Sequence, residues 1–167
     1  MSILILYGGD LAKDIAERIC EAGKAAAAAT SFEVVSMEQC KKGIEPGVAT
    51  VICVLQTVEN AEAPESAGRF TRFMKRNSHP TDLLSSSRAT PLAFTVLALG
   101  DSNLLMDRQT TTAKDCNQVA QKLDARLAEL GATAFCARGE ADDRTGNQEI
   151  APWLERLQIA MAQARAA

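Results

Sequence analysis

The chain has 167 residues, of which 47% are hydrophobic and 23% charged, and its formal net charge at pH 7 is −3. This length suits one domain with a sizeable core, so we predict a single domain over residues 1–167. The acidic balance argues against a nucleic acid or an anionic membrane as partner. No stretch approaches the roughly 20 apolar residues of a membrane-spanning helix, so we expect no membrane span.

The cysteine and histidine content restricts the possible chemistry. His79 is the only histidine, and the five cysteines include no Cys-x-x-Cys pair. These cysteines are Cys20, Cys40, Cys53, Cys116 and Cys136. Scattered thiols in odd number are typical of buried, reduced cysteines in a cytoplasmic protein. We therefore predict a cytoplasmic location, no metal site and no catalytic residues of its own.

In the first half of the chain, short apolar runs alternate with helical periodicity. Strands are predicted at Ser2–Tyr7, Phe32–Ser36 and Val48–Leu55, and helices after the first strand and at Ser66–Arg76. Leu11, Ile15 and Ile19 recur every four residues and define the buried face of the first helix. The run Ala25–Ala29 either extends that helix or forms a surface loop.

The second half continues the same alternation. A polar loop over Asn77–Thr90 precedes a strand at Leu92–Leu99, a long loop at Leu104–Ala113 and a helix at Lys114–Leu130 that stops at Gly131. A strand at Thr133–Ala137 and a helix at Ala151–Ala164 complete the chain. Strands alternating with helices predict an α/β fold whose parallel sheet is linked by crossover helices.

Motifs in register along nearly the whole chain resemble one known family. They are Leu6-Tyr7-Gly8, Asp14–Ile19, Glu62–Phe70, Leu99–Asn103, Asp124–Leu127 with Glu129–Ala132, Gly139–Asp143 and Pro152–Leu154. Together they are similar to the FMN-binding domain of the diflavin reductases, the group that includes cytochrome P450 reductase and methionine synthase reductase. Ala141-Asp142-Asp143, Gly146 and Pro152-Trp153 are most similar to methionine synthase reductase.

The resemblance implies a flavodoxin-like three-layer sandwich with a five-stranded parallel sheet of order 2-1-3-4-5. It also implies FMN in the crevice at the carboxyl ends of the strands, and electrons supplied by a separate FAD and NADPH module. The family's three FMN loops fall on Gly8, Gly9, Asp10 and Leu11, on Gln56, Thr57, Val58, Glu59, Asn60 and Ala61, and on Gly100, Asp101, Ser102, Asn103 and Leu104.

The first of these loops departs from the family pattern. The family's hydroxyl-rich stretch is replaced by Gly8-Gly9-Asp10-Leu11-Ala12-Lys13, which contains no hydroxyl. We expect Asp10 to cap the following helix, its carboxylate accepting the amide hydrogens that a phosphate would use. Two like charges about 4 Å apart repel by about 4 kcal/mol near a protein surface. A ligand-binding role for Asp10 remains the alternative.

The second and third loops also lack residues that the family uses. Glu59 and Ala61 stand in place of two glycines, and neither readily adopts a positive φ. Leu104 replaces an aromatic side chain that would cover the flavin, a stacking contact worth roughly 1–3 kcal/mol. Thr57 and Asn60 are retained. Glu62 and Glu65 are also interpreted as first-turn acids of the next helix, with Pro64 near its start, and Phe94 and Trp153 as packing residues.

An acidic cluster follows the last predicted strand. Glu140, Asp142 and Asp143 are expected in a loop, as a solvated face. The family resemblance offers the alternative that they form a docking surface for an electron-transfer partner.

Two functional hypotheses follow. The first is a module with weak or no FMN binding that acts through a protein partner, in a redox or regulatory role. The second is a working FMN electron carrier, an oxidoreductase component that accepts electrons from a separate reductase. Binding of another planar or phosphorylated ligand remains open but has no motif of its own.

Overall fold

The computed structural model describes residues 2–26, 29–104 and 116–166. Its strands are β1 (Ser2–Gly8), β2 (Ser31–Ser36), β3 (Thr50–Gln56), β4 (Ala93–Gly100), β5 (Thr133–Ala134) and β6 (Gly139–Asp142). Its helices are α1 (Asp10–Ala26), α2 (Glu65–Met74), α4 (Gln118–Glu129) and α5 (Ile150–Ala166), with short 3₁₀ turns η1 (Glu59–Ala61), η2 (Ser102–Leu104) and η3 (Asp143–Thr145). Most of the predicted loop Leu104–Ala113, the first residues of the predicted helix Lys114–Leu130 and part of the Ala25–Ala29 run lie outside the described residues.

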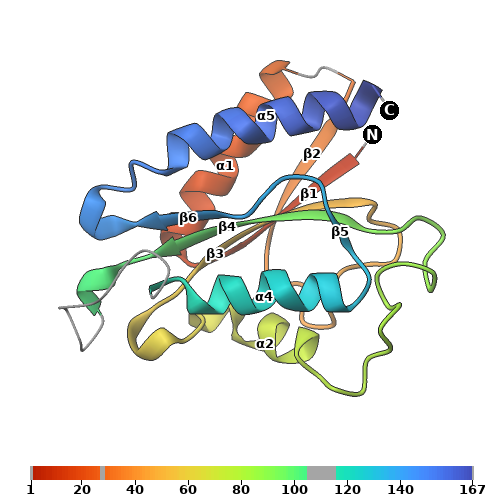
Figure 1. Ribbon diagram of the computed structural model, residues 1–167, viewed down its shortest axis with the longest axis horizontal. Coiled ribbons are helices and arrows are strands. Elements are labelled where there is room, and N and C mark those ends of the chain that lie inside the picture. The colour runs from red at the N-terminus through yellow and green to blue at the C-terminus, as the bar shows by residue number, and fades with distance from the viewer. Residues whose placement is uncertain (1, 27–28, 105–115, 167) are drawn as a thin grey trace.

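The sheet confirms the predicted topology. Its strand order is β2-β1-β3-β4-β5, and every pairing within it is parallel. Helices α1 and α5 cover one face and α2 and α4 the other, which gives the expected three layers (Figure 1). Side chains alternate along the strands between the two apolar cores, so Ile52 and Val54 pack toward α1 and α5, whereas Val51, Cys53 and Leu55 pack toward α2 and α4.

Strand β3 occupies the centre of the sheet. Its residues Val51–Leu55 are fully buried, as the nearly continuous apolar run predicts for a parallel strand covered on both faces. The register pairs Gly8 of β1 with Leu55, and Gln56 with Leu99 of β4. Strands β1, β3 and β4 therefore end side by side, and the segments that follow them meet at one edge of the sheet.

The last part of the sheet differs from the prediction. Instead of one strand at Thr133–Ala137, the chain forms β5 and then β6, both parallel to β4. Glu140 and Asp142 therefore lie in a strand, and the prediction that they belong to a solvated loop is wrong. The segment Gly139–Asp142 has little apolar character. It becomes a strand because the unpaired edge of β4, from Leu97 to Gly100, offers it hydrogen-bonding partners.

Trp153 holds α5 against this added strand, which confirms its predicted packing role. Its side chain is fully buried, and its indole Nε1 donates a hydrogen bond to the Ala137 carbonyl at 3.0 Å. A Cβ added at Gly139 would lie 2.5 Å from Trp153 Cδ1, so the indole ring rests directly on the backbone of β6. Phe94 is likewise buried in the opposite core, as expected.

No helix within the three described segments is long and apolar enough to cross a membrane. Cys20, Cys40, Cys53 and Cys136 are free thiols, and Cys20, Cys53 and Cys116 are buried. Burial raises the pKa of the Cys53 thiol to about 12, so this side chain remains protonated and unreactive at neutral pH.

We expect Trp153→Phe to destabilise the protein by about 1–3 kcal/mol, because it removes the indole hydrogen bond and leaves a small cavity over Gly139. Urea unfolding measures the change. The control is Ile159→Ala, since Ile159 lies on the same helix and is 60% exposed. Equal stabilities of the two variants would contradict the proposed role of Trp153 in holding α5 to β6.

Candidate functional site

The candidate site lies where β1, β3 and β4 end. The first loop runs from Gly8 into α1, the second follows Gln56, and the third follows Gly100 into η2. In a parallel α/β sheet, ligands bind at this carboxyl edge, where the connections of neighbouring strands lead to opposite faces. Strands β1 and β3 are such a pair, since β1 leads into α1 and β3 leads toward α2, on the other face.

The first loop makes its hydrogen bonds to side chains from other elements. The Ala12 amide donates to Gln56 Oε1 at 3.2 Å, and the Gly9 amide donates to Ser66 Oγ at 3.2 Å. Gly9 has φ +109°, and a Cβ added there would overlap Gln56 Oε1. Both amides lie at the positive end of α1, where an anion would bind. Side chains of the protein itself already occupy these donors.

Asp10 does not have the predicted capping role. The carbonyl of Gly9 accepts the first helical hydrogen bond, from Lys13, so Asp10 is an exposed residue of the first turn. The prediction that its carboxylate accepts the helix amides is wrong for Ala12, whose amide bonds to Gln56. The acceptor, Gln56, lies 44 residues away in the sequence, so no local sequence pattern could predict this hydrogen bond.

Three carboxylates surround the first loop. A pocket of about 550 Å³ is lined by Asp10, Glu38 and Glu65, together with Gly9, Gln56 and Ser66. Lys13, which could have offset these charges, is not among the residues that line it. The pocket next to the α1 amides is therefore acidic.

The second loop is fastened to α4 and contains one strained residue. Thr57 is buried, and its Oγ1 accepts a hydrogen bond from the Val119 amide in the first turn of α4 at 3.3 Å. Ala61 has φ +56°, so its backbone is left-handed, a conformation that the Cβ of alanine makes unfavourable. Glu59 is not among the described residues with positive φ. The backbone thus keeps a glycine-like turn at Ala61 only.

The start of α2 confirms part of the prediction for this region. Glu65 is the first residue of the helix and Pro64 precedes it, as expected. Glu62 lies outside the helix and pairs instead with Val58, whose amide donates to the Glu62 carbonyl at 2.9 Å. The interpretation of Glu62 as a first-turn acid is therefore wrong.

The third loop is positioned by Asp142. The Ser102 amide donates to Asp142 Oδ1 at 2.9 Å, and the Arg144 amide donates to the same oxygen at 3.1 Å. Asp142 is only 1% exposed, so the expected solvated acid is a buried carboxylate at the end of β6. Burial raises the pKa of Asp142, but the hydrogen bonds from Ser102 and Arg144 outweigh this effect and hold the pKa below its ordinary value.

Apolar side chains are exposed beside the site. Leu104, at the end of η2, is 42% exposed, and Val58 in the second loop is 36% exposed. The described part of the third loop has no aromatic residue, and Asp101 Oδ1 accepts from the Asn103 amide within the turn. Leu104 therefore presents an aliphatic surface where the family resemblance implies a stacking aromatic ring.

Replacing Ala61 by glycine should stabilise the protein by about 0.5–1 kcal/mol. The gain is the left-handed strain of alanine, about 1–2 kcal/mol, less the entropy that glycine adds to the unfolded chain. Ala63→Gly in the same loop is the control. Ala63 has no positive φ to relieve, so this variant should lose about 0.4–1 kcal/mol. Equal losses in thermal unfolding of both variants would disprove the strain at Ala61.

Asp142 should make stability depend on pH. Because its pKa is lowered in the folded state, it stabilises the fold above its ordinary pKa, and this contribution disappears as the pH falls through the folded-state value. We expect Asp142→Asn to cost about 1–3 kcal/mol at pH 7 and progressively less toward pH 3. Urea unfolding across this range, with Asp143→Asn as the exposed control, measures it. A cost independent of pH would refute the assignment.

Comparison with known proteins agrees with this geometry. The family model described as flavodoxin matches residues 8–153. Methionine synthase reductase from Bos taurus is 30% identical over 161 residues, which cover 95% of this chain and 21% of that protein. NADPH-dependent diflavin oxidoreductase 1 from Danio rerio is 31% identical over 92% of this chain and 24% of its own length. The chain thus spans less than a quarter of the length of these relatives.

Solved structures show the same fold. A point mutant of flavodoxin from Pseudomonas aeruginosa superposes with a TM-score of 0.68 over 96% of this chain and 98% of its own, at 19% identity. A short-chain flavodoxin associated with a bacterial microcompartment gives a TM-score of 0.64 over 96% of this chain and 99% of its own, at 14% identity. With the strand order 2-1-3-4-5 and the family match over most of its length, the chain belongs to the flavodoxin family.

Proposed function

We propose that this chain is a single flavodoxin-family domain that binds FMN weakly or not at all and acts through a protein partner. The observation that carries the proposal is the state of the first loop. The Gly9 and Ala12 amides, which would receive a phosphate, are bonded to Ser66 and Gln56. The residues present therefore do not fit the phosphate of FMN without rearrangement.

Rearrangement would cost free energy in two ways. Displacing Gln56 and Ser66 breaks two hydrogen bonds, each worth about 0.5–1.5 kcal/mol net. A phosphate would then lie beside a pocket that Asp10, Glu38 and Glu65 make acidic. One pair of like charges about 4 Å apart costs about 4 kcal/mol near the surface, and a dianion would experience more.

The ring end of the site adds a further loss. Leu104 cannot stack as an aromatic side chain does, which removes roughly 1–3 kcal/mol. Since each 1.4 kcal/mol changes a dissociation constant about tenfold, the combined effects would reduce FMN affinity by several orders of magnitude.

A working FMN electron carrier is the second candidate, and one observation favours it. Ala61 keeps a left-handed backbone at the position of a family glycine, although alanine disfavours this conformation. The diflavin relatives named above suggest that a separate reductase would supply the electrons in that case. For either candidate we propose a cytoplasmic location, because scattered cysteines without a Cys-x-x-Cys pair are typical of a reducing compartment.

An FMN titration separates the two candidates. We expect a colourless protein that does not quench flavin fluorescence at micromolar FMN. The double substitution Glu59→Gly and Leu104→Tyr should raise FMN affinity at least tenfold, because it restores a flexible turn and a stacking ring. Ile159→Tyr adds a tyrosine at an exposed position on α5 and is the matched control.

Bound flavin in the purified protein, or saturable quenching at low micromolar FMN, would overturn the proposal and establish the electron carrier. A double variant that binds no better than the Ile159→Tyr control would show that the first loop alone limits affinity. Gln56→Ala, which frees the Ala12 amide, then tests that loop directly.

A further inference from the structure

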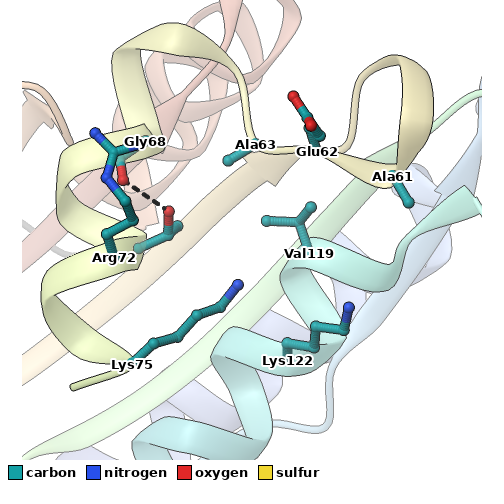
Figure 2. A pocket seen from close by; sticks show the side chains of 9 residues that line it. Ala61, Glu62, Ala63, Gly68, Arg72, Lys75, Val119 and Lys122 are labelled. Carbon is teal, nitrogen blue, oxygen red and sulfur yellow. Dashed lines mark hydrogen bonds between the residues drawn. The ribbon is translucent and has the colours of Figure 1, made fainter.

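A basic groove lies between α2 and α4 and adjoins the second loop of the candidate flavin site at Ala61. A pocket of about 290 Å³ between these helices is lined by Arg72 of α2, Lys75 directly after α2, Lys122 of α4 and Glu62 of the second loop. Figure 2 shows the Lys75 and Lys122 side chains extending into this pocket and the Glu62 carboxylate pointing away from them. All three cationic side chains belong to exposed residues.

The groove continues beyond this pocket in both directions. A second pocket of about 320 Å³ shares Lys75 and Lys122 with the first and adds Asn77 and Arg126. Toward the start of α2, a further pocket of about 760 Å³ shares Arg72 and adds Arg69 and Lys41, but Glu38, Glu62 and Glu65 line it as well, so its charge is mixed. The predominantly basic part of the groove is therefore the pair of pockets that share Lys75 and Lys122, which together are longer than a single small anion needs.

Three cations of the groove form no ion pair within the described part of the chain, a property they share with most described lysines and arginines, Arg18 and Lys24 included. Among the described residues, the ion pairs are made by Arg126, Arg138 and Arg144, and Arg138 lies between Asp124 and Glu140. Within the same part of the chain, Arg72, Lys75 and Lys122 take part in none of these pairs. Three cations and one acid, Glu62, thus line the pocket between α2 and α4, in a chain whose net charge is −3.

The spacing of these residues along α2 carries a cost within the fold. Arg69, Arg72 and Lys75 follow one another at intervals of three, so like charges are neighbours on the helix surface and weaken it. Glu65, four residues before Arg69, is the one carboxylate of α2, and none lies beside Arg72 or Lys75 on that helix. A partner that brings negative charge would remove this repulsion.

We infer that the groove between α2 and α4 docks an acidic segment of a partner protein, with carboxylates of that segment facing Arg72, Lys75 and Lys122. Long, exposed lysine and arginine side chains in an open trough suit a row of carboxylates better than one phosphate, which needs convergent and buried donors. Such charge pairs accelerate association and select the partner by its sign. The inference shares with the proposed function the expectation of a protein partner, but it uses a different surface.

Binding of a fluorescein-labelled peptide of ten glutamates, measured by anisotropy at low salt, tests the inference. We expect saturable binding that weakens steeply with added salt. The double substitution Lys75→Glu and Lys122→Glu should weaken it at least tenfold. The matched control is Arg18→Glu with Lys24→Glu, which changes the net charge equally at exposed positions of α1 on the opposite face.

Equal loss in the two double variants would overturn the inference, because binding would then follow net charge alone. Competition by pyrophosphate at concentrations equal to the peptide would also overturn it, in favour of a small-anion site. Sedimentation velocity with a concentration-dependent shift that Lys75→Glu and Lys122→Glu abolish would instead identify a second copy of the chain as the occupant. Amide chemical shifts that change at Gly68, Lys75 and Lys122 upon peptide addition would support it.

The FMN titration of the same variants keeps this test independent of the proposed function. Both double variants should leave FMN quenching as it is in the parent chain. Tight FMN binding together with groove-dependent peptide binding would reject the proposed function and retain the inference. If neither FMN nor the peptide binds, the proposed weak FMN site is retained and the inference of a docking groove is rejected.

Discussion

The parallel pairing of β3 between β1 and β4 is the constraint on which the rest of the structure depends. The register places Gly8 opposite Leu55 and Gln56 opposite Leu99, so the three strands end at the same level. Whatever residue follows Leu55 must lie against the start of α1. The chemistry of the first loop is therefore set as much by β3 as by the residues of the loop itself.

This constraint lets the protein satisfy its own helix ends. Gln56 accepts from the start of α1, Thr57 accepts from the start of α4, and Asp142 accepts from the third loop. The first amides of a helix have no partner within the helix, and burying them unpaired would cost free energy. Because side chains of neighbouring elements supply these partners, the edge of the sheet is stable without a bound anion.

The sequence predicted what depends on apolar periodicity. The structure confirmed the buried run of β3 and the inward face of α1 with Ile15 and Ile19. It also confirmed the strand order, which the family resemblance had implied. Two features could not be predicted from the sequence because they depend on residues far apart in the chain. Strand β6 forms where β4 leaves an open edge, and the Ala12 amide meets Gln56 from another strand. A third feature is the positive φ of Ala61, which alanine disfavours on its own. The pairing of Val58 with Glu62 closes the turn and holds Ala61 in this conformation.

The distribution of charge links the two proposals. Asp10, Glu38 and Glu65 line the pocket beside the loop where an anionic cofactor would bind, whereas Arg72, Lys75 and Lys122 line an open pocket between α2 and α4. A site selected for a phosphate would have the reverse arrangement, since unneutralised charge acts over about 8–10 Å at physiological salt. Because side chains bond the first amides of α1 and α4, these helix ends are satisfied without a bound anion. The surface of α2 and α4 can then carry the recognition of a partner, with the sheet serving as its rigid support.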